Sequence, residues 1–140
     1  PSDIEAVSSI THAHATSVEA CLLYVDIARR LLKGQQLPEI LLGLETSTTY
    51  ARLQTLADLT EDDIRSSGYV VDTLEAALWC LLTSTSYPET VLKAVNLGDD
   101  TDTVAAVAGG LAGIIYGLEG IPDNWLAQLR NKELLESCLF

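Results

Sequence analysis

Gly98-Asp-Asp-Thr-Asp-Thr103 leads directly into Val104-Ala-Ala-Val-Ala-Gly-Gly-Leu-Ala-Gly113. Three carboxylates and two hydroxyls fall within five residues, at the start of a segment made only of small and apolar residues. Carboxylate and hydroxyl oxygens are the ligands that hard divalent cations prefer. Aspartates are also common at helix starts, where they accept hydrogen bonds from free backbone N–H groups and meet the positive end of the helix dipole. The stretch therefore predicts a helix over 101–116 whose first turn is either a cation site or an acidic cap.

Two features of this stretch favour the cation site. One cap residue suffices for a helix, and crowded carboxylates repel one another unless a cation offsets their charge. The helix also carries small residues at four-residue spacing, namely Ala105, Gly109, Gly113 and Gly117. Each Gly costs about 1 kcal/mol of helix stability relative to Ala, so we expect another backbone to approach this stripe and bury the helix. Because neither Cys nor clustered His accompanies the carboxylates, Mg²⁺, Ca²⁺ or Mn²⁺ is favoured over zinc or copper.

The rest of the chain is predicted to be helical as well. Apolar residues recur at helical spacing, with capping residues before the helices and Gly after them. The helix expected over 38–56 has a weak point at Ser47 to Thr49. No segment alternates as a strand does, so we predict a single all-α segment over residues 1–140 with short loops. The other expected helices cover 15–32, 38–56, 71–82, 86–97 and 132–138, with a further short helix around Trp125.

Composition excludes several classes of function. The chain has 140 residues, 48% of them hydrophobic, which is typical of a globular domain. Its net charge of −12 argues against a nucleic-acid partner, because phosphate backbones require a basic surface. The longest uncharged segment, Thr103 to Leu118, is shorter than the ~20 residues of a membrane span, so no membrane partner is expected. Three widely separated cysteines favour reduced thiols and a cytoplasmic location.

The acidic stretch and the glycine-rich helix together resemble the C-terminal metal motif of the ADP-ribosylglycohydrolases. Three further segments resemble the family in the same order: Ser-Ile-Thr-His at 9–12, Gly-Tyr-Val-Val-Asp-Thr-Leu-Glu-Ala-Ala at 68–77, and Ile-Pro to Trp at 121–125. The resemblance spans residues 9–125. It implies the C-terminal half of an orthogonal helical bundle built around a binuclear Mg²⁺ or Mn²⁺ centre. It also implies hydrolysis of the glycosidic bond between ADP-ribose and a protein side chain or related acceptor.

The resemblance also assigns roles to individual residues. Asp100, Asp102 and Thr103 correspond to metal ligands, and Asp100 and Asp102 would act in catalysis through the bound metal. Asp102 is the best candidate to contact both ions. His12 would lie near the ribose or the phosphates, and Tyr69 would line the nucleotide pocket. Without the resemblance, His12 would be interpreted as a loop or cap residue and Tyr69 as a core or turn aromatic.

The chain also departs from the family pattern. Family members are much longer, and their N-terminal half supplies further metal ligands in a Thr-Asp-Asp motif. Nothing here matches that motif, and Thr60-Glu-Asp-Asp63 is interpreted as a helix cap. We therefore expect the chain to need an N-terminal half as a partner, from the same or a separate chain, and to be inactive alone on an ADP-ribosylated protein or small ADP-ribose conjugate. The alternatives are a non-catalytic binding or structural module of the same fold and a plain helical interaction domain.

Two further interpretations concern residues outside the acidic stretch. His12 and His14 are two positions apart, so on a helix they would face different directions and could not form a two-His metal site. Trp79 and Trp125 lie in apolar contexts and are predicted to belong to the core.

Overall fold

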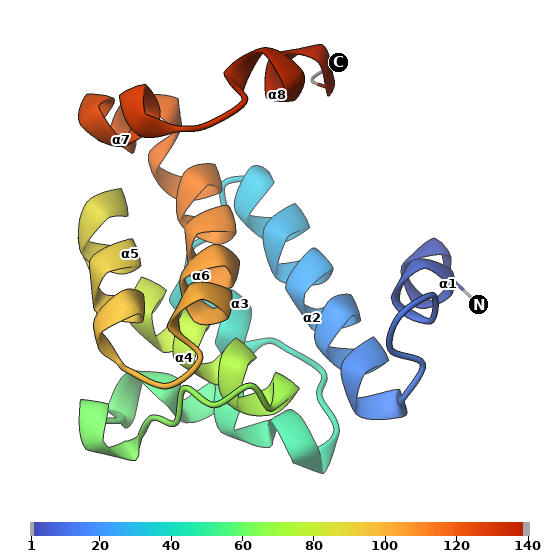
Figure 1. Cartoon of the computed structure of the whole chain (residues 1–140). Coiled ribbons are helices and arrows are strands. Elements are labelled where there is room, and N and C mark those ends of the chain that lie inside the picture. Colours follow the sequence, from blue (N-terminus) through green and yellow to red (C-terminus); the bar gives the residue numbers. More distant parts are fainter. Residues whose placement is uncertain (1, 139–140) are drawn as a thin grey trace.

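The prediction of an all-α chain is confirmed. The computed structural model describes residues 2–138, which contain no strand and are 72% helical. Four helices form the body: α2 (Ala15–Leu32), α4 (Val70–Leu82), α5 (Tyr87–Asn96) and α6 (Thr101–Tyr116). Figure 1 shows α6 between α5 and α2, with α4 behind it. Within the described residues, no helix is both long enough and apolar enough to cross a bilayer.

Shorter elements surround this body. Helix α1 (Asp3–Ser8) packs against α2, and α3 (Leu37–Leu42) packs against α2 and the 3-10 helix η1 (Thr48–Asp58). The 3-10 helices η2 (Glu61–Asp63) and η3 (Leu118–Gly120) precede α4 and follow α6. The chain then continues through α7 (Asp123–Gln128) and α8 (Lys132–Cys138), which contain no buried residue and extend across one end of the body (Figure 1).

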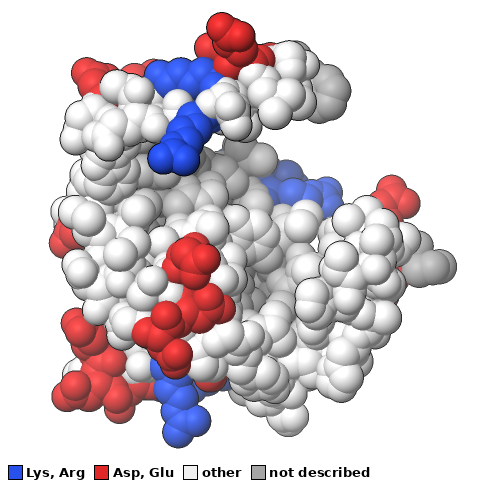
Figure 2. Space-filling model, viewed as in Figure 1, with Lys and Arg blue, Asp and Glu red and all other residues white. Residues whose placement is uncertain are grey.

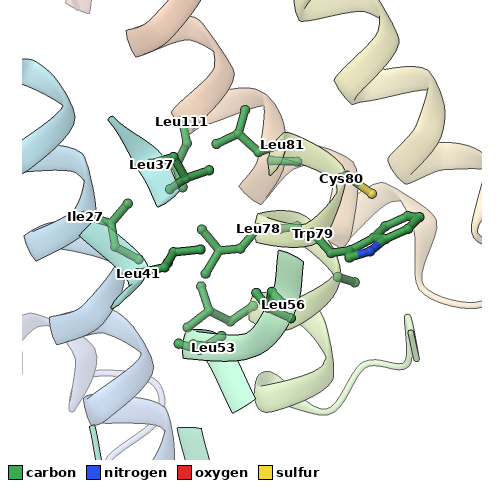
Figure 3. Close-up of a cluster of buried hydrophobic side chains, with 14 of the residues drawn as sticks. Ile27, Leu37, Leu41, Leu53, Leu56, Leu78, Trp79, Cys80, Leu81 and Leu111 are labelled. Carbon is green, nitrogen blue, oxygen red and sulfur yellow. The ribbon is translucent and has the colours of Figure 1, made fainter. Parts of the chain in front are cut away.

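Helix α4 is the centre of the core. Every residue from Thr73 to Leu81 is buried, so the helix is covered on all sides. Figure 3 shows Leu78 facing Ile27 and Leu41 from the surrounding elements. Trp79 is also buried, and its indole N–H donates to the Leu59 carbonyl at 3.0 Å, which confirms its predicted place in the core. Trp125 is only half-buried, with its ring edge-on to Tyr87 at a centroid distance of 6.3 Å.

The predicted continuous helix over 38–56 is wrong. Helix α3 ends at Leu42, and η1 begins separately at Thr48 with Ser47 as its N-cap. Glu19 of α2 accepts hydrogen bonds from both the backbone N–H and the hydroxyl of Ser47, each at 2.7 Å. This tertiary contact fixes Ser47 in an extended conformation (φ −66°, ψ 170°), which the interior of a helix does not allow.

The glycine stripe on α6 does not meet another backbone within the described residues. The helix instead buries Val104, Ala108, Leu111 and Ala112. A Cβ on Gly109 would meet side chains of α5, Tyr87 and Val91, at 3.4 and 3.5 Å, and one on Gly113 would meet nothing within 4 Å. The four-residue spacing predicted that the stripe itself is buried. The residues of α6 that are buried in the core lie on a different face of the helix.

Gly113 lies in α6 and Gly117 is its C-cap. Replacing each with alanine is expected to change the free energy of unfolding in opposite directions. Gly113 has open space around it, so Gly113→Ala in this chain should raise the free energy of unfolding by about 0.5–1 kcal/mol. Gly117 has φ +68°, and a Cβ there would lie 2.6 Å from a Glu119 carboxylate oxygen, so Gly117→Ala should lower it by about 1–3 kcal/mol. Urea denaturation of both variants measures these changes. Changes of the same sign in the free energy of unfolding would contradict the end of α6 at Gly117.

Candidate functional site

The acidic start of α6 is held by a neighbouring loop. The backbone N–H of Asp100 donates to the Ser66 carbonyl at 3.0 Å, and the Ser66 hydroxyl donates to the Gly98 carbonyl at 2.9 Å. Ser66 is itself buried, so both hydrogen bonds are shielded from water. Between these contacts the chain turns through Gly98 (φ +87°) and Asp99 (φ +59°). The loop before α4 and the turn before α6 therefore fix where the first turn of α6 lies.

Asp100 occupies the N-cap position of α6, but its carboxylate does not cap the helix. It accepts no hydrogen bond from a backbone N–H, and its Oδ1 instead accepts one from the Thr103 hydroxyl at 2.9 Å. On its other side, a Cβ at Gly68 would lie 3.2 Å from Asp100 Oδ2, closer than nine in ten such contacts. A glycine at this position therefore lets the loop before α4 pass close to the carboxylate. Two of the three predicted metal ligands, Asp100 and Thr103, are in direct contact.

One cavity joins the segments that were singled out in the sequence. It has a volume of about 650 Å³, and its wall includes His12, Gly68, Tyr69 and Thr103. These residues come from the loop before α2, the start of α4 and the start of α6. Asp100 lies beside Gly68 at the edge of this cavity. Asp102 is exposed and is not part of the cavity wall.

The two histidines lie in the loop before α2, so the helical premise used for them was wrong. The His12 backbone N–H and carbonyl are both hydrogen-bonded to Ser8, which holds the residue in a turn. His14 is the N-cap of α2, and its Nδ1 accepts from the Thr16 N–H at 3.2 Å. Both histidines line the cavity. His14 was missed as a wall residue because its spacing was judged for a helix.

Tyr69 lines the cavity and is largely exposed to solvent. It is 55% exposed and occupies the N-cap position of α4. Its backbone N–H donates to the Ser67 hydroxyl, which in turn donates to the Asp72 carboxylate at 2.6 Å. These contacts hold the backbone of Tyr69 and leave its side chain free to meet a ligand. Tyr69 is therefore not a core aromatic.

The donor atoms at the start of α6 fit a hard cation in type but not in number. A carboxylate and a hydroxyl converge there, and both are oxygen donors suited to Mg²⁺ or Mn²⁺. Mg²⁺ takes about six oxygen ligands. Residues 2–138 bring no three Asp, Glu, His or Cys side chains together in a metal-binding arrangement. The described chain therefore offers part of a ligand set.

Comparison with known sequences places the chain in a family. The sequence profile of the ADP-ribosylglycohydrolases matches residues 2–139. The chain belongs to the ADP-ribosylglycohydrolase family. This confirms the resemblance on which the residue assignments rest, and it agrees with the all-α fold.

Several ADP-ribosylglycohydrolase relatives are similar over most of this chain. The ADP-ribosylarginine hydrolase Tri1 of Pseudomonas putida is 40% identical over 126 residues, which cover 87% of this chain and 34% of the relative. Tri1 of Serratia proteamaculans is 34% identical, covering 96% of this chain and 38% of the relative. The ADP-ribosyl-[dinitrogen reductase] glycohydrolase of Rhodospirillum rubrum is 31% identical, covering 94% and 45%. The chain thus spans less than half the length of these relatives.

Proposed function

We propose that this chain forms part of a metal-dependent ADP-ribosylglycohydrolase, which hydrolyses the bond between ADP-ribose and a protein side chain or related acceptor. The supporting observation is the single cavity whose wall contains His12, Tyr69 and Thr103, with Asp100 at its edge. These residues come from segments more than 90 positions apart in sequence, from His12 to Thr103. Their convergence is what a binding site requires and what a plain helix cap at Asp100 does not explain.

Asp100, Asp102 and Thr103 would hold Mg²⁺ or Mn²⁺ in a binuclear centre. When bound, such ions supply positive charge and acidify a coordinated water. The chain itself positions the ligands. Ser66 anchors the backbone of Asp100, Gly68 leaves room for its carboxylate, and the Thr103 hydroxyl donates to that carboxylate. Ligands that are held before the cation arrives cost less free energy to order on binding.

His12 and Tyr69 would bind the ADP-ribose part of the substrate. The imidazole of His12 can hydrogen-bond to ribose or phosphate oxygens, and the exposed ring of Tyr69 offers an apolar face to the nucleotide. Both line the cavity whose edge carries the proposed ligands, so a substrate held by them lies next to the acidic start of α6. This arrangement would orient the scissile bond by binding, which contributes as much as acid–base chemistry does.

The remaining ligands would come from an N-terminal half of the same domain, on this polypeptide or on a separate chain. The chain spans only 34–45% of the length of three relatives, and its own donors are too few. The substrate would be an ADP-ribosylated protein or a small ADP-ribose conjugate. A non-catalytic module of the same fold is the second candidate, because residues 2–138 hold no cluster of three metal-binding side chains.

Reconstitution tests the proposal. The chain would be co-expressed with the part of the Pseudomonas putida relative that lies outside the matched 126 residues. Release of ADP-ribose from an ADP-ribosylarginine substrate would then be followed with Mg²⁺, with Mn²⁺ and with EDTA. We expect release that requires the metal and both parts, with none from the chain alone. A complex that forms but releases nothing, while the intact relative is active in the same buffer, would favour the non-catalytic module.

A further inference from the structure

One face of α6 is exposed although it carries no charged side chain. From Thr103 to Leu118 the sequence contains no Asp, Glu, Lys or Arg. Ala106 and Gly110 are nevertheless exposed. A helix without polar residues on any side is typically buried on all sides. Tyr24 of α2 reaches this face at Gly110, whereas Ala106 remains exposed.

An apolar groove runs beside this face. It lies between α2, α4 and α6, has a volume of about 290 Å³, and is lined chiefly by Val25, Val70, Leu74 and Val107. Tyr24 also lines the groove and ties α2 to α6, because its hydroxyl donates to the Val107 carbonyl at 3.3 Å. Figure 2 shows an uncharged, hollowed surface between α6 and α2, with acidic residues over the start of α6.

The groove continues into the candidate site. Cys21, Val70 and Val107 line both the groove and the larger cavity that contains His12 and Thr103. A segment lying in the groove would therefore reach the edge of the candidate metal site. That is where the described residues supply too few ligands.

We propose that the exposed face of α6 and the adjoining groove dock an apolar helix from the remainder of the ADP-ribosylglycohydrolase domain. This inference rests on the proposed function and names the surface through which the missing part joins the site. The chain spans 34% of the Pseudomonas putida relative, so most of such a domain lies outside it. The small side chain of Ala106 lets a second helix come close to α6, and the groove takes that helix's aliphatic side chains.

Thiol labelling reports on this docking without reference to activity. Cys21 lies in the groove wall, whereas Cys80 is fully buried and burial raises the pKa of its thiol to about 12, so it should not react. In a Cys138→Ser background, Cys21 is then the reactive thiol. We expect Cys21 to label at least about tenfold more slowly in the complex with the remainder of the Pseudomonas putida relative than in the chain alone. Peptide mass spectrometry identifies the labelled residue.

A pair of matched substitutions locates the surface. Ala106→Lys places a charge on the exposed face of α6, four residues after Asp102, which should favour the helix itself. Val95→Lys is the control, on an exposed position of α5. We expect Ala106→Lys to weaken association with the remainder by at least about tenfold and Val95→Lys to change it by less than about twofold.

The experiments are run in EDTA, so they separate docking from the proposed metal chemistry. A complex with protected Cys21 that hydrolyses nothing when metal is added would support the docking and contradict the proposed function. Failure of the two parts to associate, or equal labelling of Cys21 with and without the remainder, would overturn the docking. Dimerisation of the chain alone through Cys21-protecting contacts would also overturn it, because a second copy would then occupy the groove.

Discussion

Replacing both Asp100 and Asp102 with Asn should lower the proposed metal-dependent hydrolysis by at least about 100-fold, measured in the complex of this chain with the remainder of the Pseudomonas putida relative. Asn keeps the size of each side chain and removes the negative charge that a divalent cation requires. Asp100 does not cap α6 through its carboxylate, so the helix should keep its stability. The measurement is ADP-ribose release at saturating Mn²⁺, together with a urea denaturation curve for each protein.

Asp99→Asn is the matched control for this double variant. It removes the same kind of charge one residue away, and its left-handed backbone (φ +59°) is one that Asn adopts readily. We expect Asp99→Asn to retain activity within about twofold of the parent protein, as is usual for an exposed position away from the reacting groups. Full activity in the Asp100→Asn, Asp102→Asn protein would eliminate the metal assignment.

Leu78→Ala should lower the free energy of unfolding by about 3 kcal/mol. Leu78 is fully buried at the centre of α4, and Figure 3 shows it among Ile27 and leucines from other elements. The substitution removes apolar contacts and leaves a cavity that rigid helices on several sides cannot close. For a domain whose total stability is about 5–15 kcal/mol, this is a large fraction. Urea denaturation of the two proteins gives the difference.

Leu92→Ala serves as the comparison for the core substitution. Leu92 is 49% exposed on α5, so its truncation should cost less than about 0.5 kcal/mol. If Leu78→Ala also cost less than about 1 kcal/mol, α4 would not be the centre of the core.

The helix α6 could be predicted closely from sequence because its end signals are local. The acidic stretch before Thr101 and the glycine at 117 mark its two ends, and the structure begins and ends the helix between them. The break between α3 and η1 was predicted only as a weak point at Ser47 to Thr49 within one helix. It depends on Glu19, which lies 28 residues before Ser47 and contacts it only in the folded chain.

Only part of the candidate site could be predicted from local sequence patterns. The residue types of Asp100 and Thr103 indicated hard ligands, and their contact follows from three-residue spacing on one helix turn. The places of His12 and Tyr69 came from the family resemblance, because no local pattern brings them to α6. The anchoring role of Ser66 could not be predicted, since its bond to Gly98 spans 32 residues and nothing local marks it. The buried face of α6 was wrongly predicted because the glycine stripe lies beside the true core face.

The most direct test of the central claim is anomalous diffraction from crystals of the assembled protein loaded with Mn²⁺. We expect manganese within about 2.5 Å of oxygen atoms of Asp100, Asp102 and Thr103. We also expect ligands from outside this chain to complete the coordination. Manganese bound elsewhere, with these three side chains contacting only protein or water, would contradict it.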